Sequence, residues 1–177
     1  MGDDMMPKIG CCYREGEYDR SVLKESGGRL LGLGRSCLHA DYRGGTAMYL
    51  LWNGLADYVQ EHGIEVLFGT ASCLGTNMEE IKQSLSLLHH RHRAPENLRV
   101  RVLENHYQNM NLCDEDDVNR VKAMRDVPAL IKGYLRLGGF IGDGAYVDQA
   151  FNTTDVCLVM DTEKLNATQR SIYTRGA

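Results

Sequence analysis

Long hydrophobic runs are absent from this sequence of 177 residues. No apolar stretch reaches the ~18 residues that a membrane-spanning helix needs. The acidic start, MGDDMMPKIG, also lacks the apolar segment of a secretory signal, so we expect a cytoplasmic protein. The net charge is not positive either, because the sequence contains 20 Lys and Arg residues and 24 Asp and Glu residues. This balance argues against a dedicated nucleic-acid-binding protein and predicts no nucleic-acid partner.

Paired cysteines and metal-ligand motifs are also missing. The six cysteines include no C-x-x-C pair, which indicates free thiols in a reducing compartment. The run HHRHR at residues 89–93, with His106 later, lacks the cysteine or carboxylate that would complete a zinc set, so we predict no metal. The run is typical of a basic helix end, which could meet an acidic carrier protein or an anionic membrane surface.

The length of 177 residues suits one domain with a sizeable core. The pattern predicts strands near residues 30–38, 66–71, 99–103 and 155–160. Helices are expected from residue 46 to His62, from a capping box at Thr76 to Arg93, and from Pro128 to Gly138, with Leu130 and Ile131 among the inward residues. Residues 106–126 read as a surface excursion, and Gly142-Asp143-Gly144 reads as a turn.

The chain is organised around residues 29–52, RLLGLGRSCLHADYRGGTAMYLLW. This stretch predicts a buried strand, a tight loop and a helix, and the strand that follows should pair in parallel with the first. The helix carries apolar residues at helical spacing, which predicts one buried face. These residues are Met48, Leu51, Trp52, Leu55, Tyr58 and Val59. The glycine pair before the helix is either a plain turn or a phosphate-binding loop.

Five blocks in order identify a family resemblance: LGRSCLHADYRGG, FGTASCLGTN, LLHHRHRAPENLRVR, PALIKGYLRLGG and GDGAYVDQAFNTTDV. Together they resemble the ornithine N-acyltransferases of bacterial ornithine-lipid synthesis, which are relatives of the acyl-homoserine-lactone synthases. The resemblance implies a GNAT-like α/β fold, a mixed sheet with flanking helices. We expect an irregular segment at residues 1–28, the acyltransferase core at 29–165 and a tail at 166–177.

The resemblance also implies how the acyl donor is held. The donor is the acyl-phosphopantetheine thioester of an acyl carrier protein, with no tightly bound cofactor. The loop Arg43-Gly44-Gly45-Thr46 is expected to hold the phosphopantetheine at the helix N-terminus. Lys132 either contacts the carrier's phosphate or simply lays its aliphatic stem along apolar surface.

The implied acceptor is the α-amine of L-ornithine, which takes a 3-hydroxyacyl group in the first step of ornithine-lipid synthesis. Arg35, inside an apolar strand, either grips the α-carboxylate or forms a structural salt bridge. Ser36 is a candidate hydrogen-bond donor, and backbone N–H groups of residues 33–37 would stabilise the oxyanion. Asp143 and Asp155 are candidates to bind ornithine's second amine, or else they are turn formers.

Two departures from the family pattern qualify this reading. The family has a glutamate where this chain has Gly32, so His39 or Asp155 is left as a candidate base. Few residues precede the LGRSC block, so we expect the N-terminal part of the family's domain to be missing. The alternatives are a non-catalytic carrier-binding or pantetheine-binding remnant, and a related N-acyl amino acid or homoserine-lactone type synthase. Contact with the inner membrane, if any, would be peripheral.

Overall fold

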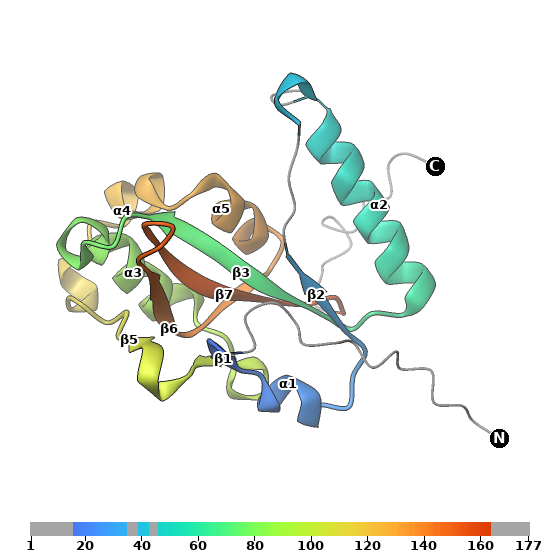
Figure 1. Cartoon of the computed structure of the whole chain (residues 1–177), viewed down its shortest axis with the longest axis horizontal. Coiled ribbons are helices and arrows are strands. Elements are labelled where there is room, and N and C mark those ends of the chain that lie inside the picture. The colour runs from blue at the N-terminus through green and yellow to red at the C-terminus, as the bar shows by residue number, and fades with distance from the viewer. Residues whose placement is uncertain (1–15, 35–38, 43–45, 164–177) are drawn as a thin grey trace.

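The computed structural model describes residues 16–34, 39–42 and 46–163. These residues form a mixed sheet in the order β1-β4-β6-β7-β3-β2, with β5 paired to β6 (Figure 1). The strands are β1 (Tyr18–Asp19), β2 (Leu30–Leu33), β3 (Val66–Leu74), β4 (Arg101–Val102), β5 (Tyr107–Gln108), β6 (Phe140–Asp148) and β7 (Thr153–Asp161). The α-helices are α1 (Ser21–Glu25), α2 (Ala47–His62), α3 (Met78–His92), α4 (Arg120–Asp126) and α5 (Ala129–Arg136). Four short 3-10 turns are η1 (Ala40–Tyr42), η2 (Glu96–Leu98), η3 (Glu104–His106) and η4 (Glu115–Asp117). The mixed sheet with flanking helices confirms the predicted fold class.

The strand–helix–strand unit at the centre of the sequence forms as predicted. Strands β2 and β3 pair in parallel from Leu30 opposite Val66 to Leu33 opposite Gly69. Helix α2 joins them and ends at Gly63, whose φ of 59° is left-handed and suits glycine. Strand β3 also pairs antiparallel with β7 along its whole length, which places β2 at the end of the described strand order.

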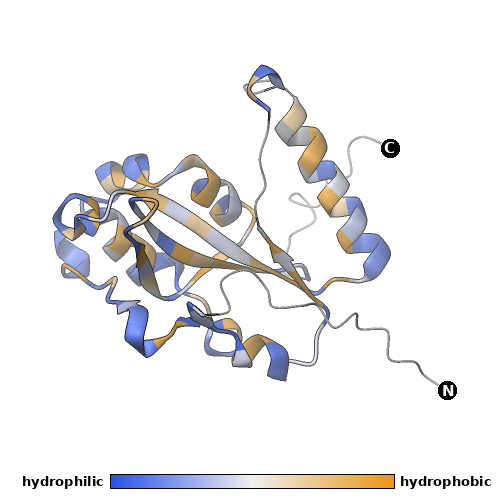
Figure 2. Cartoon of the chain, viewed as in Figure 1, coloured by the Kyte–Doolittle hydropathy of each residue, from blue (hydrophilic) through white to orange (hydrophobic). Residues whose placement is uncertain are grey.

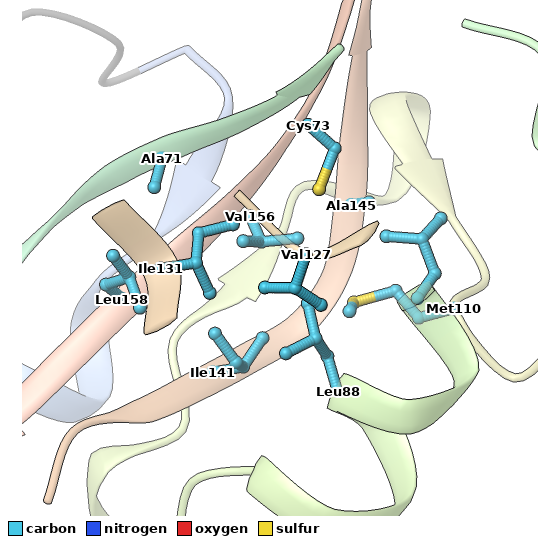
Figure 3. Close-up of a cluster of buried hydrophobic side chains, with 11 residues drawn as sticks. Ala71, Cys73, Leu88, Met110, Val127, Ile131, Ile141, Ala145, Val156 and Leu158 are labelled. Carbon is cyan, nitrogen blue, oxygen red and sulfur yellow. The ribbon is translucent and has the colours of Figure 1, made fainter. Parts of the chain in front are cut away.

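Two apolar clusters cover the two faces of the sheet. On one face, α3 and α5 pack against β3, β6 and β7 (Figure 3). The labelled side chains in that cluster are Ala71, Cys73, Leu88, Met110, Val127, Ile131, Ile141, Ala145, Val156 and Leu158. The second cluster unites β1 and α1 with β3, β4 and β7 through buried residues that include Tyr18, Leu23, Val100, Val102, Cys157 and Val159. Alternation along β7 explains how neighbouring residues serve both faces.

Residues expected to be irregular take part in the core. Tyr18 of β1 is 5% exposed and Leu23 of α1 is 0% exposed, although both lie within residues 1–28, where we expected no regular structure. These elements are two and five residues long. Elements of that length carry no readable period, so their burial depends on distant partners.

Residues 106–126 are not the surface excursion that we expected. They contain β5 and α4, and they bury Met110, Val118 and Ala123. The hydroxyl of Ser86 on α3 accepts hydrogen bonds from the backbone N–H of Leu112 at 3.0 Å and of the next residue at 3.2 Å. The expectation was wrong because a polar α3 side chain, which no local pattern marks, holds this segment against the helix.

Three smaller predictions also need correction. Gly142-Asp143-Gly144 is not a turn but an irregularity inside β6, where pairing with β7 skips from Ile141 to Ala145. Helix α3 is capped by Asn77, whose side chain accepts from the N–H of Glu79, rather than by Thr76. Leu130, expected to face inward, is 47% exposed.

Candidate functional site

The most distinctive opening in the sheet lies where β2 stops beside β3. The parallel ladder ends at Leu33 and Gly69, while β3 continues to Leu74 with only β7 beside it among the described strands. A Cβ at Gly69 would lie 2.5 Å from the carbonyl oxygen of Leu33, so the two backbones approach closely at the last pair. Beyond that pair, residues 70–74 present main-chain hydrogen-bonding groups on an edge.

Helices α2 and α5 meet near this opening through an aromatic pair. The rings of Trp52 and Tyr134 lie 5.0 Å apart at 70°, an edge-to-face arrangement. Burial raises the pKa of Tyr134 to about 12, so its hydroxyl is protonated at neutral pH. Beside Trp52 in the sequence, the side-chain oxygen Oδ1 of Asn53 is buried and accepts no hydrogen bond from the residues that the structure describes. An acceptor in this state suits an N–H donor from a ligand.

The rest of α2 is less covered than its pattern predicts. None of its described side chains is buried, and Leu50 and Tyr58 are 63% and 44% exposed. The helix projects away from the sheet and carries apolar residues along its length (Figure 2). The predicted buried face is therefore only partly covered in the described part of the chain.

Five of the predicted site residues fall outside the described ranges. Arg35, Ser36, Arg43, Gly44 and Gly45 all lie there, so their roles stay predictions.

Two residues near the predicted loop are described. Thr46 occupies the N-cap position of α2 without a side-chain capping bond. His39 is exposed, and its Nδ1 lies 3.5 Å from Oδ2 of Asp41.

Lys132 has a structural contact. Its Nζ donates a hydrogen bond to the carbonyl oxygen of Arg125 at 3.1 Å, near the C-terminal end of α4. A cation there satisfies a carbonyl that has no partner within the helix. This contact favours a role in fixing α5 to α4, and the predicted phosphate contact stays untested.

Asp143 lies in a dense charge cluster. Its carboxylate is 5% exposed and pairs with Arg93 at 2.8 Å. Arg101 forms a second, very short ion pair with it. The hydroxyl of Tyr107 donates to the same carboxylate at 3.3 Å, and the guanidinium of Arg101 lies 4.2 Å from the Tyr107 ring centroid. Two guanidinium groups already neutralise this carboxylate, so the geometry favours a structural role over binding of ornithine's amine.

The backbone around Asp143 explains how this cluster forms. The skipped residues of β6 turn toward β4, and the N–H of Asp143 donates to the carbonyl oxygen of Val100 at 2.7 Å. Gly144 adopts a φ of 80°, and a Cβ there would collide with the ring of Tyr107. A glycine pair inside a strand pattern is a signal for such a bulge, and it could have been read from the sequence. The arginine partners could not be read from the sequence, because Arg93 and Arg101 precede Asp143 by 50 and 42 residues.

Asp155 is closer to the opening. It lies on β7 opposite Ser72, in the part of β3 that extends past β2. Its side chain is fully buried, and the hydroxyl of Tyr18 donates to its backbone carbonyl at 3.2 Å. Burial, followed by the charge of Asp155, raises the pKa of Cys73 to about 11, so that thiol stays protonated. Asp143 lies on the neighbouring strand β6, but the residue opposite Asp155 is Tyr146, and the carboxylate of Asp143 pairs with Arg93 and Arg101.

The basic end of α3 is largely neutralised. Arg91 pairs with Glu115 at 2.5 Å, and a ring nitrogen of His90 lies 3.0 Å from the carbonyl oxygen of Cys113. Burial lowers the pKa of His89 and of His92. Within the described ranges, no group of three or more His, Cys, Asp or Glu could hold a metal ion. No helix there is long and apolar enough to cross a bilayer.

Comparison with known proteins gives the chain a family context. A family model described as an acetyltransferase (GNAT) domain matches residues 1–53. With the mixed sheet, this match defines a GNAT-like acyltransferase fold. No solved structure matches the chain.

Several curated L-ornithine N(alpha)-acyltransferases match the chain. The protein of Rhodobacter capsulatus is 52% identical over 172 residues, which cover 97% of this chain and 66% of that protein. The Brucella abortus protein is 43% identical over 91% of this chain and 58% of its own length. The Rhizobium meliloti protein is 38% identical over 96% of this chain and 58% of its own length. The chain is therefore homologous to the L-ornithine N(alpha)-acyltransferases, which confirms the resemblance, and it spans about three fifths of their length.

Proposed function

We propose that this chain is an acyltransferase that moves a 3-hydroxyacyl group from an acyl carrier protein to the α-amine of L-ornithine. The observation that carries the proposal is the opening between β2 and β3, where the ladder ends at Leu33 and Gly69. The homology to L-ornithine N(alpha)-acyltransferases supports the acceptor. The carrier-bound donor and the place of the reaction in lipid synthesis are our inference.

The donor arm is proposed to lie along the open edge of β3. Phosphopantetheine contains amide groups, which can pair with the main-chain groups of residues 70–74 as an added strand would. The loop Arg43-Gly44-Gly45-Thr46 would hold the phosphate at the start of α2. In this arrangement the thioester would lie near the end of β2.

The chemical step is a direct transfer without an acyl-enzyme. The deprotonated α-amine attacks the thioester carbonyl carbon, a carbon–nitrogen bond forms and the carbon–sulfur bond breaks. Backbone N–H groups of residues 33–37 would stabilise the oxyanion. The sulfur leaves on the pantetheine and takes a proton, while the amine gives up its proton to a base or to water.

The test is transfer of label from a 3-hydroxyacyl carrier protein to L-ornithine, with a panel of other amines as acceptors. Arg43→Ala should weaken binding of the carrier thioester by ~1.5–3 kcal/mol, the range for a lost charged hydrogen bond. Arg120→Ala removes the same charge from an exposed arginine on α4, outside the proposed loop, and serves as the matched control. Unchanged thioester binding in Arg43→Ala would contradict the phosphate-binding role, and preference for another amine would contradict the acceptor.

Gly32 favours a second candidate, a non-catalytic module that binds the carrier or its pantetheine. The residue is exposed on β2 and provides no carboxylate where the resemblance implies one. Thioester binding without transfer would support this module. Gly32→Glu should then raise the transfer rate, because a positioned base contributes ~10²–10⁴-fold.

A further inference from the structure

Two large apolar side chains are exposed together at one end of the sheet. Leu74, the last residue of β3, is 83% exposed, and Phe151, in the β6–β7 turn, is 70% exposed. Leu74 pairs with Thr153, the first residue of β7, so the strand end and the turn are neighbours. We call residues 74–78 and 149–154 the hairpin tip.

The backbone of the hairpin tip is fixed by hydrogen bonds. Oδ1 of Asp148 accepts from the N–H of Phe151 at 3.1 Å. The N–H of Gly75 donates to the carbonyl oxygen of Asn152 at 2.9 Å. The hydroxyl of Thr154 donates to the carbonyl oxygen of Gly75 at 2.8 Å. The exposure of the two apolar side chains is therefore built into an ordered turn.

The hairpin tip carries no formal charge. Residues 74–78 and 149–154 contain no Asp, Glu, Lys or Arg in a chain with 25% charged residues. The carboxylates that flank the turn, Asp148 and Asp155, are both buried, and the exposed Glu79 and Glu80 begin only after Met78, in the first turn of α3. Single exposed apolar residues are common on protein surfaces. An uncharged tip that presents two together can enter a bilayer interface without dehydrating an ion.

We propose that the hairpin tip is a membrane contact, with Leu74 and Phe151 entering the lipid bilayer. This inference rests on the proposed function, because joining a fatty acyl chain to an amino acid makes an amphiphile that has to pass into a membrane. Residues 70–74 of β3 run from the end of the β2 ladder to the tip, about 17 Å at ~3.4 Å per residue. The product would therefore form within one strand length of the bilayer.

The chemistry of the tip predicts which lipids matter. Apolar insertion depends on buried area, so binding should tolerate high salt and neutral lipids. The basic end of α3, the other candidate for membrane contact, would instead require anionic lipids and low salt. Arg91 and Arg93 at that end are already paired with carboxylates.

The experiment is co-sedimentation of the full chain with vesicles of phosphatidylcholine, with and without phosphatidylglycerol, at low and high salt. We expect binding to both vesicles, and a fall of about tenfold or more in the partition coefficient for the Leu74→Ser, Phe151→Ser double variant. Leu50→Ser is the matched control, since it removes an exposed leucine from α2, and it should bind as the parent chain does. Circular dichroism checks that the variants fold.

Other outcomes would overturn the proposal. They are unchanged binding of the double variant, an equal loss in Leu50→Ser, or binding that requires anionic lipid and disappears in salt. A change in self-association of the double variant without a change in vesicle binding would make the tip a protein contact. Acyl transfer is assayed separately without vesicles, so failure of the proposed reaction and failure of the membrane contact are distinguishable.

Discussion

Asp143→Asn is the substitution that separates a structural role of the charge cluster from substrate binding. The asparagine keeps the size of the side chain but removes the charge that faces Arg93 and Arg101. Loss of a charged hydrogen bond costs ~1.5–3 kcal/mol, and removing one partner of a fully buried ion pair costs ~3–5 kcal/mol. The side chains of Arg93 and Arg101 are 35% and 45% exposed, so water can solvate them after the change.

We therefore expect a loss of ~2–3 kcal/mol in the free energy of unfolding. For a chain of this size, that corresponds to a melting temperature lower by ~4–12 °C. Urea denaturation measures the first quantity and calorimetry the second. Glu104→Gln is the control, because that carboxylate pairs with Arg101 at 3.2 Å but is 86% exposed. Its loss should cost no more than ~1 kcal/mol.

The kinetic readout is the KM for L-ornithine. A structural Asp143 predicts an unchanged KM at temperatures where the variant is folded. A double-mutant cycle with Arg101→Gln should show coupling between the two side chains. Unchanged stability together with a sharply raised KM would refute this reasoning and make Asp143 the carboxylate that binds ornithine's second amine.

Three further predictions concern the bulge, the histidines and the aromatic pair. Gly144→Ala should cost at least ~1–3 kcal/mol in urea denaturation, because φ is positive and Tyr107 occupies the space. The lowered pKa values of His89 and His92 mean that the unfolded chain binds more protons below pH ~6.5, so the unfolding free energy should fall as pH drops below that value. Replacing both with glutamine should flatten that slope between melts at neutral and mildly acidic pH. Trp52→Ala should speed amide hydrogen exchange in α2, because its ring is the aromatic contact with α5.

The elements with strong local patterns were predictable from the sequence. Strand β3, helix α3 and strand β7 combine apolar periodicity with clear end signals, and the parallel β2–β3 pair follows from the helix between them. Gly138 was predicted to end α5, and it lies just past that helix with a φ of 85°. Such signals act over a few residues and need no knowledge of distant partners.

The predictions that failed concern segments whose structure depends on partners far away in the sequence. Asp143 reads locally as a turn residue, yet Val100 and two arginines draw that segment into a strand. Segment 106–126 reads as polar surface, yet Ser86 and the packing of Ala123 hold it against α3. Local propensity is overridden in both places by hydrogen bonds that only the tertiary fold supplies.

The candidate site also combines a part that local sequence predicted and a part that it did not. The parallel β2–β3 pair beside the opening follows from the strand–helix–strand order, whereas the charged residues of the site were assigned from the family resemblance alone. Asp155 lies on β7 beside the opening, while Asp143 lies in a bulge of the neighbouring strand β6. Residue types that suit a function are therefore weaker guides than the topology that positions them.

The edge formed by β2 and α2 leads to a last prediction, about the chain in solution. Strand β2 ends the described sheet, with Leu30, Leu31 and Leu33 only half-buried, and α2 leaves Leu50 63% exposed. A leucine gains ~1.5–3 kcal/mol on full burial, against a total stability of ~5–15 kcal/mol. An open strand edge also offers hydrogen bonds to another chain.

We expect concentration-dependent self-association in sedimentation velocity. Leu31→Lys on the strand should reduce it, whereas Val121→Lys, which changes an exposed valine on α4, should not. A monomer with a sharp two-state melt at all concentrations would mean that this edge is covered within the chain itself.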